Sequence, residues 1–223
     1  MKDLNQLLLK FKYKNNFKEE DFYVSKSNYY AYELITNWPK WEKNFVNLCG
    51  EKYCGKSHLT DIFLNKYKGI IIDANSLTDQ NLREIKIHEN IILDNINLTV
   101  NENLIYTLFN LIDQDNKYMI INSETPINEL NFKLNDLKSR TKNCLIAKIE
   151  KPDDELMFAL ILKSFSDRQI IIDKKLIDFI IKRIQRSYDK IFEFIYKIDE
   201  LSLKKKKPID FKTIKEVLNE QTT

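Results

Sequence analysis

One short segment of this chain has residue types and spacing that suit phosphate chemistry. The chain has three glycines, and two of them frame the run Gly50-Glu51-Lys52-Tyr53-Cys54-Gly55-Lys56-Ser57. This run fits the pattern G-x-x-x-x-G-K-[ST], in which backbone N–H groups wrap around phosphate oxygens at angles that glycine adopts most easily. Lys56 would reach the β- and γ-phosphates, and the Ser57 hydroxyl would bind Mg²⁺. We therefore predict nucleotide binding; the alternative is an ordinary turn that happens to match.

The segments on either side of this loop favour the same interpretation. Phe45-Val46-Asn47-Leu48-Cys49 predicts a buried strand just before the loop, and residues 57–66 predict a helix just after it. A helix that begins at the loop directs its N-terminal N–H groups at the bound anion. His58 is then a helix residue close to the nucleotide.

A second pattern lies downstream, where an apolar run ends in an acid. Ile91-Ile92-Leu93-Asp94-Asn95 places a carboxylate at the carboxyl end of a predicted strand. This is the Walker B pattern, whose acid holds Mg²⁺ directly or through water, so Ser57 and Asp94 are the predicted metal ligands. Many hydrolysing proteins with this pattern carry a second acid next, which positions water. Asn95 stands there instead and cannot take a proton, so we predict slow intrinsic hydrolysis.

Polar residues follow the next predicted strand, where they could face the terminal phosphate. Met119-Ile120-Ile121-Asn122-Ser123-Glu124 offers Asn122 or Glu124 as the sensor of that phosphate, and the sequence leaves both open. Leu137-Lys138-Ser139-Arg140 precedes the last predicted strand. A guanidinium at this place can act on a neighbouring subunit's nucleotide as an arginine finger in trans. The alternatives for Arg140 are a surface residue and a partner in an intrachain ion pair.

The overall composition limits the class of protein. Charged residues make up 31% of the chain, but the formal net charge of +3 is too balanced to predict nucleic-acid binding. The three cysteines show no paired spacing, which is typical of a reducing compartment. We find no apolar run of about 18 residues and no opening like a signal peptide, so we expect a cytoplasmic protein without a membrane partner.

The order of predicted elements favours an α/β fold followed by helices. The predicted strands are 44–49, 69–73, 90–94, 117–122 and 144–149, with helical patterns between them. Short unbroken apolar runs suit a parallel sheet covered on both faces, so we predict a doubly wound, five-stranded α/β domain over 21–150. A small all-α domain is predicted over 151–223, and an N-terminal segment over 1–20. The predicted helices of the all-α domain are 153–166, 173–186, 188–203 and 210–220, with helix-start residues Asp153, Asp173 and Asp210.

Taken together, these motifs resemble the AAA+ ATPases, and specifically their DnaA-related group. The resemblance covers nearly the whole chain and is strongest toward the Hda branch, the regulatory inactivators of DnaA, which share the Asp-Asn form of Walker B. The segments that carry it are Phe22-Tyr23-Val24-Ser25-Lys26-Ser27-Asn28, Trp38-Pro39-Lys40-Trp41, Gly55-Lys56-Ser57-His58-Leu59, Leu93-Asp94-Asn95-Ile96 and Leu137-Lys138-Ser139-Arg140.

The resemblance implies more about the site than the motifs alone. It implies an AAA+ phosphate-loop sheet with a helical lid, ADP or ATP as cofactor with Mg²⁺, and an entry segment that packs on adenine through residues such as Phe22 and Val24. The sensor arginine of the lid is not evident near Ser187, and Arg186 or Lys190 would have to substitute. Thr141-Lys142-Asn143 stands where the group usually has Trp-Gly. Both departures affect nucleotide sensing more than nucleotide binding.

The amino terminus holds a further candidate, a partner-binding peptide. Gln6-Leu7-Leu8-Leu9-Lys10-Phe11 resembles the peptide by which bacterial replication proteins bind the DNA polymerase sliding clamp. In an extended chain Leu7, Leu9 and Phe11 face one way and can enter a hydrophobic groove. Gln6 supplies an amide for a polar subsite. The alternative is an ordinary amphipathic strand.

The resemblance favours one function over two alternatives. The favoured one is a regulator that binds ADP or ATP, docks on the sliding clamp and presents Arg140 to ATP held by DnaA, which stimulates hydrolysis and inactivates the initiator. The alternatives are a helicase-loader-like ATPase and a non-hydrolysing nucleotide-binding interaction module. DnaA continues past its lid into a helix-turn-helix DNA-binding domain, whereas this sequence stops at Thr223. We therefore expect no sequence-specific DNA binding. The sequence also leaves open whether the chain assembles with copies of itself into a homo-oligomer.

Overall fold

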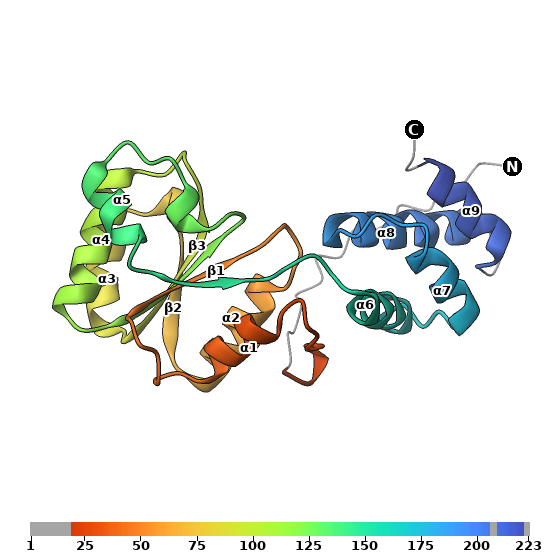
Figure 1. The fold of residues 1–223 in the computed structure, drawn as a ribbon, viewed down its shortest axis with the longest axis horizontal. Helices are drawn as coiled ribbons and strands as arrows, with labels where there is room; N and C mark the ends of the chain where they lie inside the picture. The colour runs from red at the N-terminus through yellow and green to blue at the C-terminus, as the bar shows by residue number, and fades with distance from the viewer. Residues whose placement is uncertain (1–18, 206–208, 221–223) are drawn as a thin grey trace, which may run out of the picture.

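The computed structural model of the chain describes residues 19–205 and 209–220. The predicted clamp-binding residues Gln6, Leu7, Leu9 and Phe11 lie outside these ranges. Figure 1 shows an α/β part and a helical part lying side by side, joined where the chain leaves the sheet. Residues 150–152, which the sequence marks as the boundary between them, lie at this junction.

The strands of the α/β part form one parallel sheet with the order β2-β3-β4-β1-β5, which confirms the predicted five-stranded sheet. The third strand runs past its predicted end at Asp94, through an irregular pairing between Leu93 and Ile96. The strands are β1 (Phe45–Cys49), β2 (Gly69–Asp73), β3 (Asn90–Ile96), β4 (Tyr118–Ser123) and β5 (Leu145–Lys148). Because they are parallel, their carboxyl ends share one edge of the sheet, where ligands of such folds bind.

Side chains along the inner strands β3, β4 and β1 alternate between two cores, one on each face of the sheet, whereas on the edge strand β2 Ile72 enters one core and Ile71 is 47% exposed. Ile91 and Leu93 of β3 enter one core, whereas Ile92 enters the other. Burying each such side chain contributes about 1.5–3 kcal/mol, which explains why these strands are rich in apolar residues. Helices α3 (Asp79–Glu84), α4 (Glu102–Gln114) and α5 (Asn135–Thr141) cover the first face, and α1 (Tyr29–Thr36) and α2 (Lys56–Lys66) cover the second (Figure 1).

A buried amide joins three segments at the carboxyl edge of the sheet. Asn47, in the middle of β1, is 0% exposed. Its Nδ2 donates to the carbonyl of Ile121 and to Ser123 Oγ in β4, both at 2.8 Å. Its Oδ1 accepts the N–H of Ile127, also at 2.8 Å, at the start of the 3-10 helix η4 (Ile127–Glu129). Unpaired, a buried polar group costs about 1–3 kcal/mol, so these contacts fix β4 and η4 on β1.

The helical part has a hydrophobic core of its own. Its helices are α6 (Asp154–Asp167), α7 (Lys174–Ile181), α8 (Tyr188–Lys205) and α9 (Phe211–Glu220). Asp153, Asp173 and Asp210 accept backbone N–H groups of the first turns of α6, α7 and α9, as the sequence predicts. One boundary differs: α7 ends at Ile181 rather than 186, because the Ile180 carbonyl accepts the N–H of Arg183 and the chain tightens into a turn.

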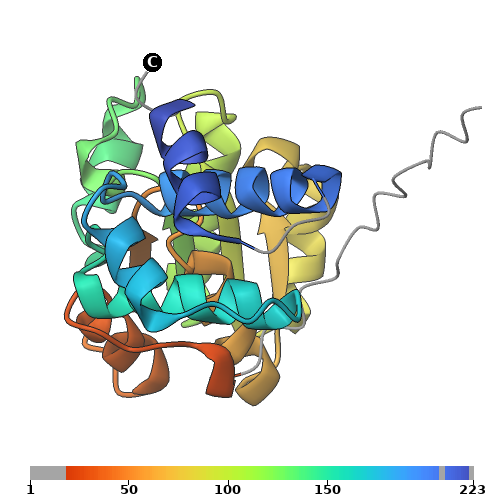
Figure 2. The same cartoon turned by 90° about the vertical axis from the view of Figure 1, so that its right-hand side faces the viewer.

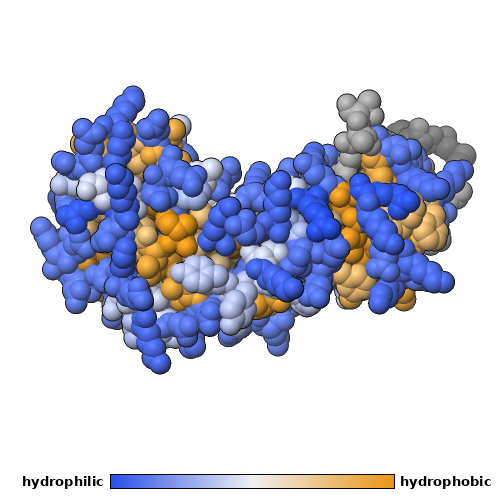
Figure 3. Space-filling model, viewed as in Figure 1, coloured by the Kyte–Doolittle hydropathy of each residue, from blue (hydrophilic) through white to orange (hydrophobic). Residues whose placement is uncertain are grey.

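The two parts leave a hollow between them. Figure 2 looks onto the helical part with the sheet behind it, and Figure 3 shows a mainly hydrophilic face with a notch between the two parts. Within the described ranges, no helix has the length and apolar character needed to cross a membrane. The remaining 3-10 helices of these ranges are η1 (Glu19–Asp21), η2 (Ala74–Ser76) and η3 (Ile85–Ile87).

Candidate nucleotide-binding site

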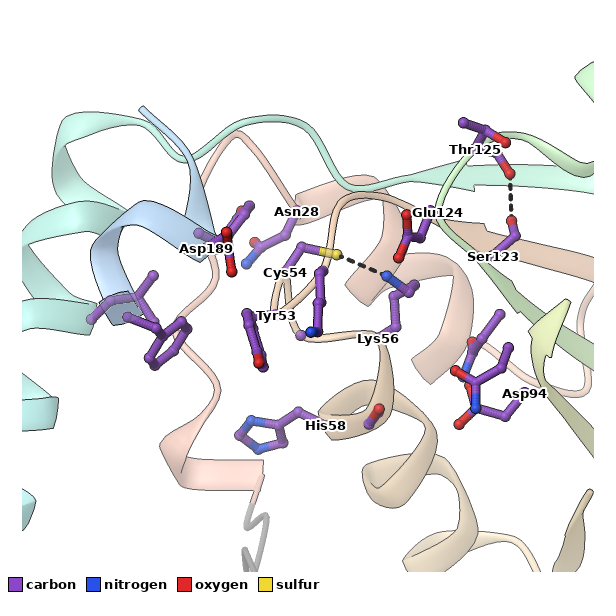
Figure 4. A pocket seen from close by; sticks show the side chains of 18 of the residues that line it. Asn28, Tyr53, Cys54, Lys56, His58, Asp94, Ser123, Glu124, Thr125 and Asp189 are labelled. Carbon is purple, nitrogen blue, oxygen red and sulfur yellow. Dashed lines mark hydrogen bonds between the residues drawn. The ribbon is translucent and has the colours of Figure 1, made fainter. Parts of the chain in front are cut away.

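A cleft of about 1340 Å³ opens at the carboxyl edge of the sheet, between the α/β part and the helical part. Figure 4 shows its interior, with Lys56 between Asp94 on one side and Asp189 on the other. Its lining includes, from the α/β part, Phe22, Lys52, Tyr53, Cys54, Gly55, Lys56, Ser57, His58, Asp94, Asn95, Asn122 and Glu124, and from the helical part Leu156, Leu160, Arg168, Tyr188, Asp189, Phe192 and Glu193. Most of the predicted nucleotide-binding residues are therefore brought together.

The phosphate loop connects β1 to α2 in a conformation that needs its glycines. Gly55 has φ +104°, a left-handed angle that glycine adopts without strain. A Cβ on Gly50 would lie 2.8 Å from Cys54 Sγ and 2.9 Å from the carbonyl of Ile149, so no larger residue fits. Because α2 begins at Lys56, its first N–H groups open toward the loop, which is the arrangement that binds phosphate in other proteins.

The ammonium of Lys56 lies inside the loop and is held by its carbonyls. Nζ donates to the Gly50 carbonyl at 2.6 Å and to the Glu51 carbonyl at 3.0 Å, and lies 3.7 Å from Cys54 Sγ (Figure 4). Burial raises the pKa of the Cys54 thiol, so this cysteine is neutral at pH 7. The cation is thus positioned where a phosphate oxygen would replace the carbonyls.

The Walker B acid is oriented by the neighbouring strand. Asn122 Nδ2 donates to Asp94 Oδ1 at 3.0 Å, and Asn122 is 1% exposed. Of the two sensor candidates, Asn122 therefore contacts the acid, whereas Glu124 is an exposed residue of the cleft wall. Asp61 of α2 is a carboxyl that the sequence motifs did not indicate. The pKa of the Asp61 carboxyl is raised above its ordinary value, mainly by burial. The nearby His58 partly offsets this, and the charge of Asp94 adds to it.

Asn95 stands where many relatives of this motif have a second acid, and its side chain is hydrogen-bonded to Asp73 of the neighbouring strand. Its Nδ2 donates to Asp73 Oδ2 of β2 at 2.6 Å, and its φ of 58° is left-handed. This hydrogen bond, together with the N–H of Asn75, lowers the pKa of Asp73. The amide at this position therefore supports the edge of the sheet and supplies no base to the cleft.

Aromatic and apolar side chains form the wall nearest the amino-terminal entry segment. The ring of Phe22 lies 5.7 Å from that of Tyr32 and 5.1 Å from that of His58, between centroids. The Phe22 ring also approaches Gly55, where an added Cβ would lie 3.2 Å from it. Val24, predicted beside Phe22 as a nucleotide contact, is half-buried and is not part of the cleft lining.

The helical part contributes acids to the cleft where the sequence suggested a cation. Arg186, the predicted substitute sensor, donates to Asp154 at 2.7 Å and is not part of the lining. Asp189, three residues later, does line the cleft. Arg168 lines it too, but is held by Asp199 and by the carbonyl of Ser164. Sequence spacing gives no signal that distinguishes the roles of these three residues, because each role is set by contacts between the elements.

The predicted arginine finger lies on α5, outside this chain's own cleft. Arg140 forms an ion pair through Nη1 with Asp113, and its Nη2 donates to Asn110 Oδ1 at 2.7 Å. Both partners belong to α4. The Arg140 side chain remains 38% exposed, so a neighbouring molecule can reach it, but the intrachain ion pair weighed as an alternative is present.

Comparison with known proteins gives relatives in replication initiation. No family model matches the chain. It is 25% identical over 198 residues to the chromosomal replication initiator protein DnaA of Borreliella afzelii, covering 77% of this chain and 41% of that protein. The DnaA of Caldanaerobacter subterraneus is 24% identical over 228 residues, with 90% and 51% covered. An uncharacterised Haemophilus influenzae protein is 24% identical over 213 residues, with 90% and 92% covered. The chain thus spans about half the length of these DnaA relatives.

Solved structures give the same fold. Domain III of Thermotoga maritima DnaA superimposes with a TM-score of 0.73 at 18% identity, covering 92% of this chain and 97% of that one. A DnaA bound to AMPPCP and single-stranded DNA gives 0.67 at 19% identity, with 86% and 68% covered. The RuvB Holliday junction branch migration motor of Thermotoga maritima gives 0.62 at 16% identity, with 79% and 61% covered. The two comparisons agree: the chain is similar in sequence to DnaA proteins and has the fold of DnaA domain III, which supports a DnaA-related AAA+ protein.

Proposed function

We propose that this protein binds an adenine nucleotide, ADP or ATP, in the cleft between its two parts and acts as a regulator of replication initiation. The observation that carries nucleotide binding is the placement of Lys56 inside the glycine-framed loop, beside the Asp94–Asn122 pair. A structural relative of this fold is described as bound to AMPPCP, which supports a nucleotide as the ligand.

The donors present also fit Mg²⁺, which prefers oxygen ligands. Ser57 and Asp94 both line the cleft, and Asn122 orients the carboxylate through one of its two oxygens. They would hold Mg²⁺ against the phosphates, where the ion would neutralise phosphate charge. Lys56 would supply the remaining positive charge from within the loop. Because Asn95 is bonded to Asp73 and cannot take a proton, turnover of the bound nucleotide is slow.

The proposed regulatory activity acts on the nucleotide bound by a partner rather than on the nucleotide bound by this chain. The chain would dock on the sliding clamp through residues 6–11 and present Arg140 to ATP held by DnaA. An exposed guanidinium stabilises the charge that develops on a transferred phosphoryl group, an effect worth about 10³–10⁵ in rate where a GTPase-activating protein supplies it. Two features support this assignment, the partly exposed position of Arg140 on α5 and its absence from this chain's own cleft.

The decisive measurement is ATP hydrolysis by DnaA with and without this protein and DNA-loaded clamp. We expect stimulation by the wild-type protein and its loss in Arg140→Ala, with ADP binding unchanged. Arg140→Lys should fail almost as fully, because a point charge does not reproduce the planar fork of arginine. Arg83→Ala, which removes an exposed arginine of α3, is the matched control and should stimulate normally.

Three outcomes would contradict the proposal. Normal stimulation by Arg140→Ala would make Arg140 a surface residue, and loss of the folded state together with every activity would make its pair with Asp113 a scaffold contact. Wild-type protein that binds ADP but leaves DnaA unaffected would favour the non-hydrolysing interaction module. Thermal melting of each variant separates the second outcome from the others.

A further inference from the structure

The phosphate loop holds the start of a helix from the other part of the molecule. Glu51 Oε1 accepts the backbone N–H of Tyr188 at 2.7 Å, and Glu51 Oε2 accepts the Ser187 hydroxyl at 3.0 Å. Tyr188 is the first residue of α8. The carboxylate of Glu51 thus binds the amino end of α8 from a residue 137 positions away in sequence.

A carboxylate at this position stabilises a helix for two reasons. The first N–H groups of a helix have no partner within it, and the helix dipole favours negative charge at that end. Most helices meet this need with a residue just before the first turn, as Asp153 does for α6. For α8 the loop that is proposed to bind phosphate supplies an acceptor, the Glu51 carboxylate, to the N–H of Tyr188.

A second contact fixes the same helix one turn further along. The ring of Tyr53 lies 5.5 Å from the ring of Phe192, between centroids, and Tyr53 adopts a left-handed φ of 66°. Tyr188 itself packs with Cys54 in the core on the α2 face of the sheet, and its hydroxyl donates to the Glu150 carbonyl at 3.1 Å. The loop therefore contacts α8 at residues that also line the cleft.

The main chain of Glu51 takes part in the phosphate site as well. Its carbonyl accepts Lys56 Nζ at 3.0 Å, while its carboxylate holds α8. A phosphate that binds Lys56 competes with this carbonyl. The same residue is thus bonded on one side to the cation of the loop and on the other to the helix that closes the cleft.

We propose that Glu51 is a positioning residue that preorganises the α8 wall of the cleft for nucleotide and couples occupation of the loop to the position of α8. This inference rests on nucleotide binding as proposed above. Because coupling free energies are reciprocal, a contact between loop and helix that favours binding is itself strengthened when nucleotide binds. Glu51 is not part of the cleft lining, so it acts on the nucleotide through Tyr188 and Lys56.

The test is a double-mutant cycle read by ADP affinity in calorimetry. Glu51→Ala and Ser187→Ala should each weaken ADP binding, Glu51→Ala by about tenfold, since an unorganised wall must be ordered on binding. The double variant should bind no more weakly than Glu51→Ala, because both changes break the same link. Glu155→Ala, which removes an exposed acid of α6 outside this cleft, should bind ADP like the wild type.

Hydrogen exchange supplies a readout that does not depend on ligand. In the nucleotide-free protein, Glu51→Ala should speed exchange at the first-turn amides of α8 while leaving those of α4 unchanged. ADP should slow exchange there in the wild type and fail to do so in Glu51→Ala. Unchanged exchange and unchanged ADP affinity in Glu51→Ala would overturn the inference. Absence of ADP binding in the wild type would overturn the proposed function and the coupling with it, whereas exchange at α8 would still report whether Glu51 holds the helix.

Discussion

The side chain of Asn95 donates to the carboxylate of Asp73 at 2.6 Å, linking the carboxyl ends of β3 and β2. Asn95 follows directly on Asp94, at the position where many hydrolysing proteins with this motif have a water-positioning acid. Here that position is occupied by an amide that donates its hydrogen bond to β2. Weak turnover is thus expected both from the chemistry of the side chain and from its direction.

Asn95→Asp should raise the rate of ATP turnover. An aspartate at position 95 would face the Asp73 carboxylate at hydrogen-bond distance, and like charges repel, so we expect the new acid to turn toward the cleft. A positioned general base contributes about 10²–10⁴ in rate, and we expect the lower end because the geometry was not built for it. Single-turnover hydrolysis by the purified variant measures this. Asn97→Asp is the control for added charge alone, and equal rates in wild type and Asn95→Asp would refute the explanation of slow turnover.

Asp189→Arg should shift nucleotide preference toward ATP. The acid lies in the cleft wall, where it repels phosphate, and an arginine there would instead donate to phosphate oxygens (Figure 4). We expect ATP affinity to rise by about tenfold, equal to about 1.4 kcal/mol, and ADP affinity to rise less. Calorimetric titration with each nucleotide is the measurement. Glu155→Arg adds the same charge outside the cleft; a similar gain in that variant would mean that only net charge matters.

Asp153→Ala should destabilise the junction between the entry segment and α6. Asp153 Oδ1 accepts the Leu156 N–H at 2.8 Å, and Oδ2 accepts the Ser27 hydroxyl at 2.9 Å. Loss of a helix cap costs about 0.5–2 kcal/mol, and we expect the upper half because the Ser27 contact is lost as well. Urea unfolding of the wild type and the variant at pH 7 measures the difference, with Glu155→Ala as the control.

The same comparison should depend on pH with a defined sign. Burial acts to raise the pKa of Asp153, but hydrogen bonds from Leu156 and Ser27 outweigh it, so the folded pKa is lowered. A carboxyl with a lowered folded pKa contributes its full stabilisation above its unfolded pKa of about 3.9 and loses it as pH falls through the folded value. The stability gap between wild type and Asp153→Ala should therefore be constant from pH 7 to about pH 5 and shrink at lower pH. A gap that widens on acidification would contradict the assignment.

Replacing Leu9 and Phe11 together with Ala should abolish binding to the sliding clamp. Both side chains face the same way in an extended peptide and would fill one hydrophobic groove. Residues 6–11 lie outside the described ranges, and we expect circular dichroism and melting of the double variant to match the wild type. Surface plasmon resonance against immobilised clamp is the measurement. Retained affinity in the double variant, or a lowered melting temperature that accounts for the loss, would remove this peptide from the proposed function.

Those parts of the site that depend on local pattern could be predicted from the sequence. The loop from Gly50 to Ser57, the strand before it and Asp94 at the end of β3 follow from glycine placement and apolar runs, and the structure brings them to one edge of the sheet. The caps at Asp153, Asp173 and Asp210 were predictable because a helix start is specified within a few residues.

The remaining features depend on contacts between distant segments. Asn95 is hydrogen-bonded to Asp73 of β2, and Arg140 forms an ion pair with Asp113 of α4. Glu51 accepts the N–H of Tyr188 in α8, so in each case the partner lies on another element. Sequence spacing carries no signal for such pairs. The presence of Asp189 rather than Arg186 in the cleft wall was missed for the same reason, because Arg186, just before α8, is held by Asp154 of α6.

The three hydrogen bonds of Asn47 have a consequence for how this protein tolerates change. Val46 and Leu48, on either side, fill hydrophobic cores, so exchange for another aliphatic residue of similar volume should be accepted. At position 47 an aliphatic residue would leave the buried Ile127 N–H without its acceptor and remove the donor to Ser123 Oγ, which would keep only its own hydrogen bond to the Thr125 carbonyl. A charged residue there would be buried without compensation. In a saturation screen for nucleotide binding, position 47 should therefore be as intolerant as Lys56, although its side chain contacts β4 and η4 and does not line the cleft. Sensitivity to substitution would then mark the scaffold of the site as strongly as the site itself.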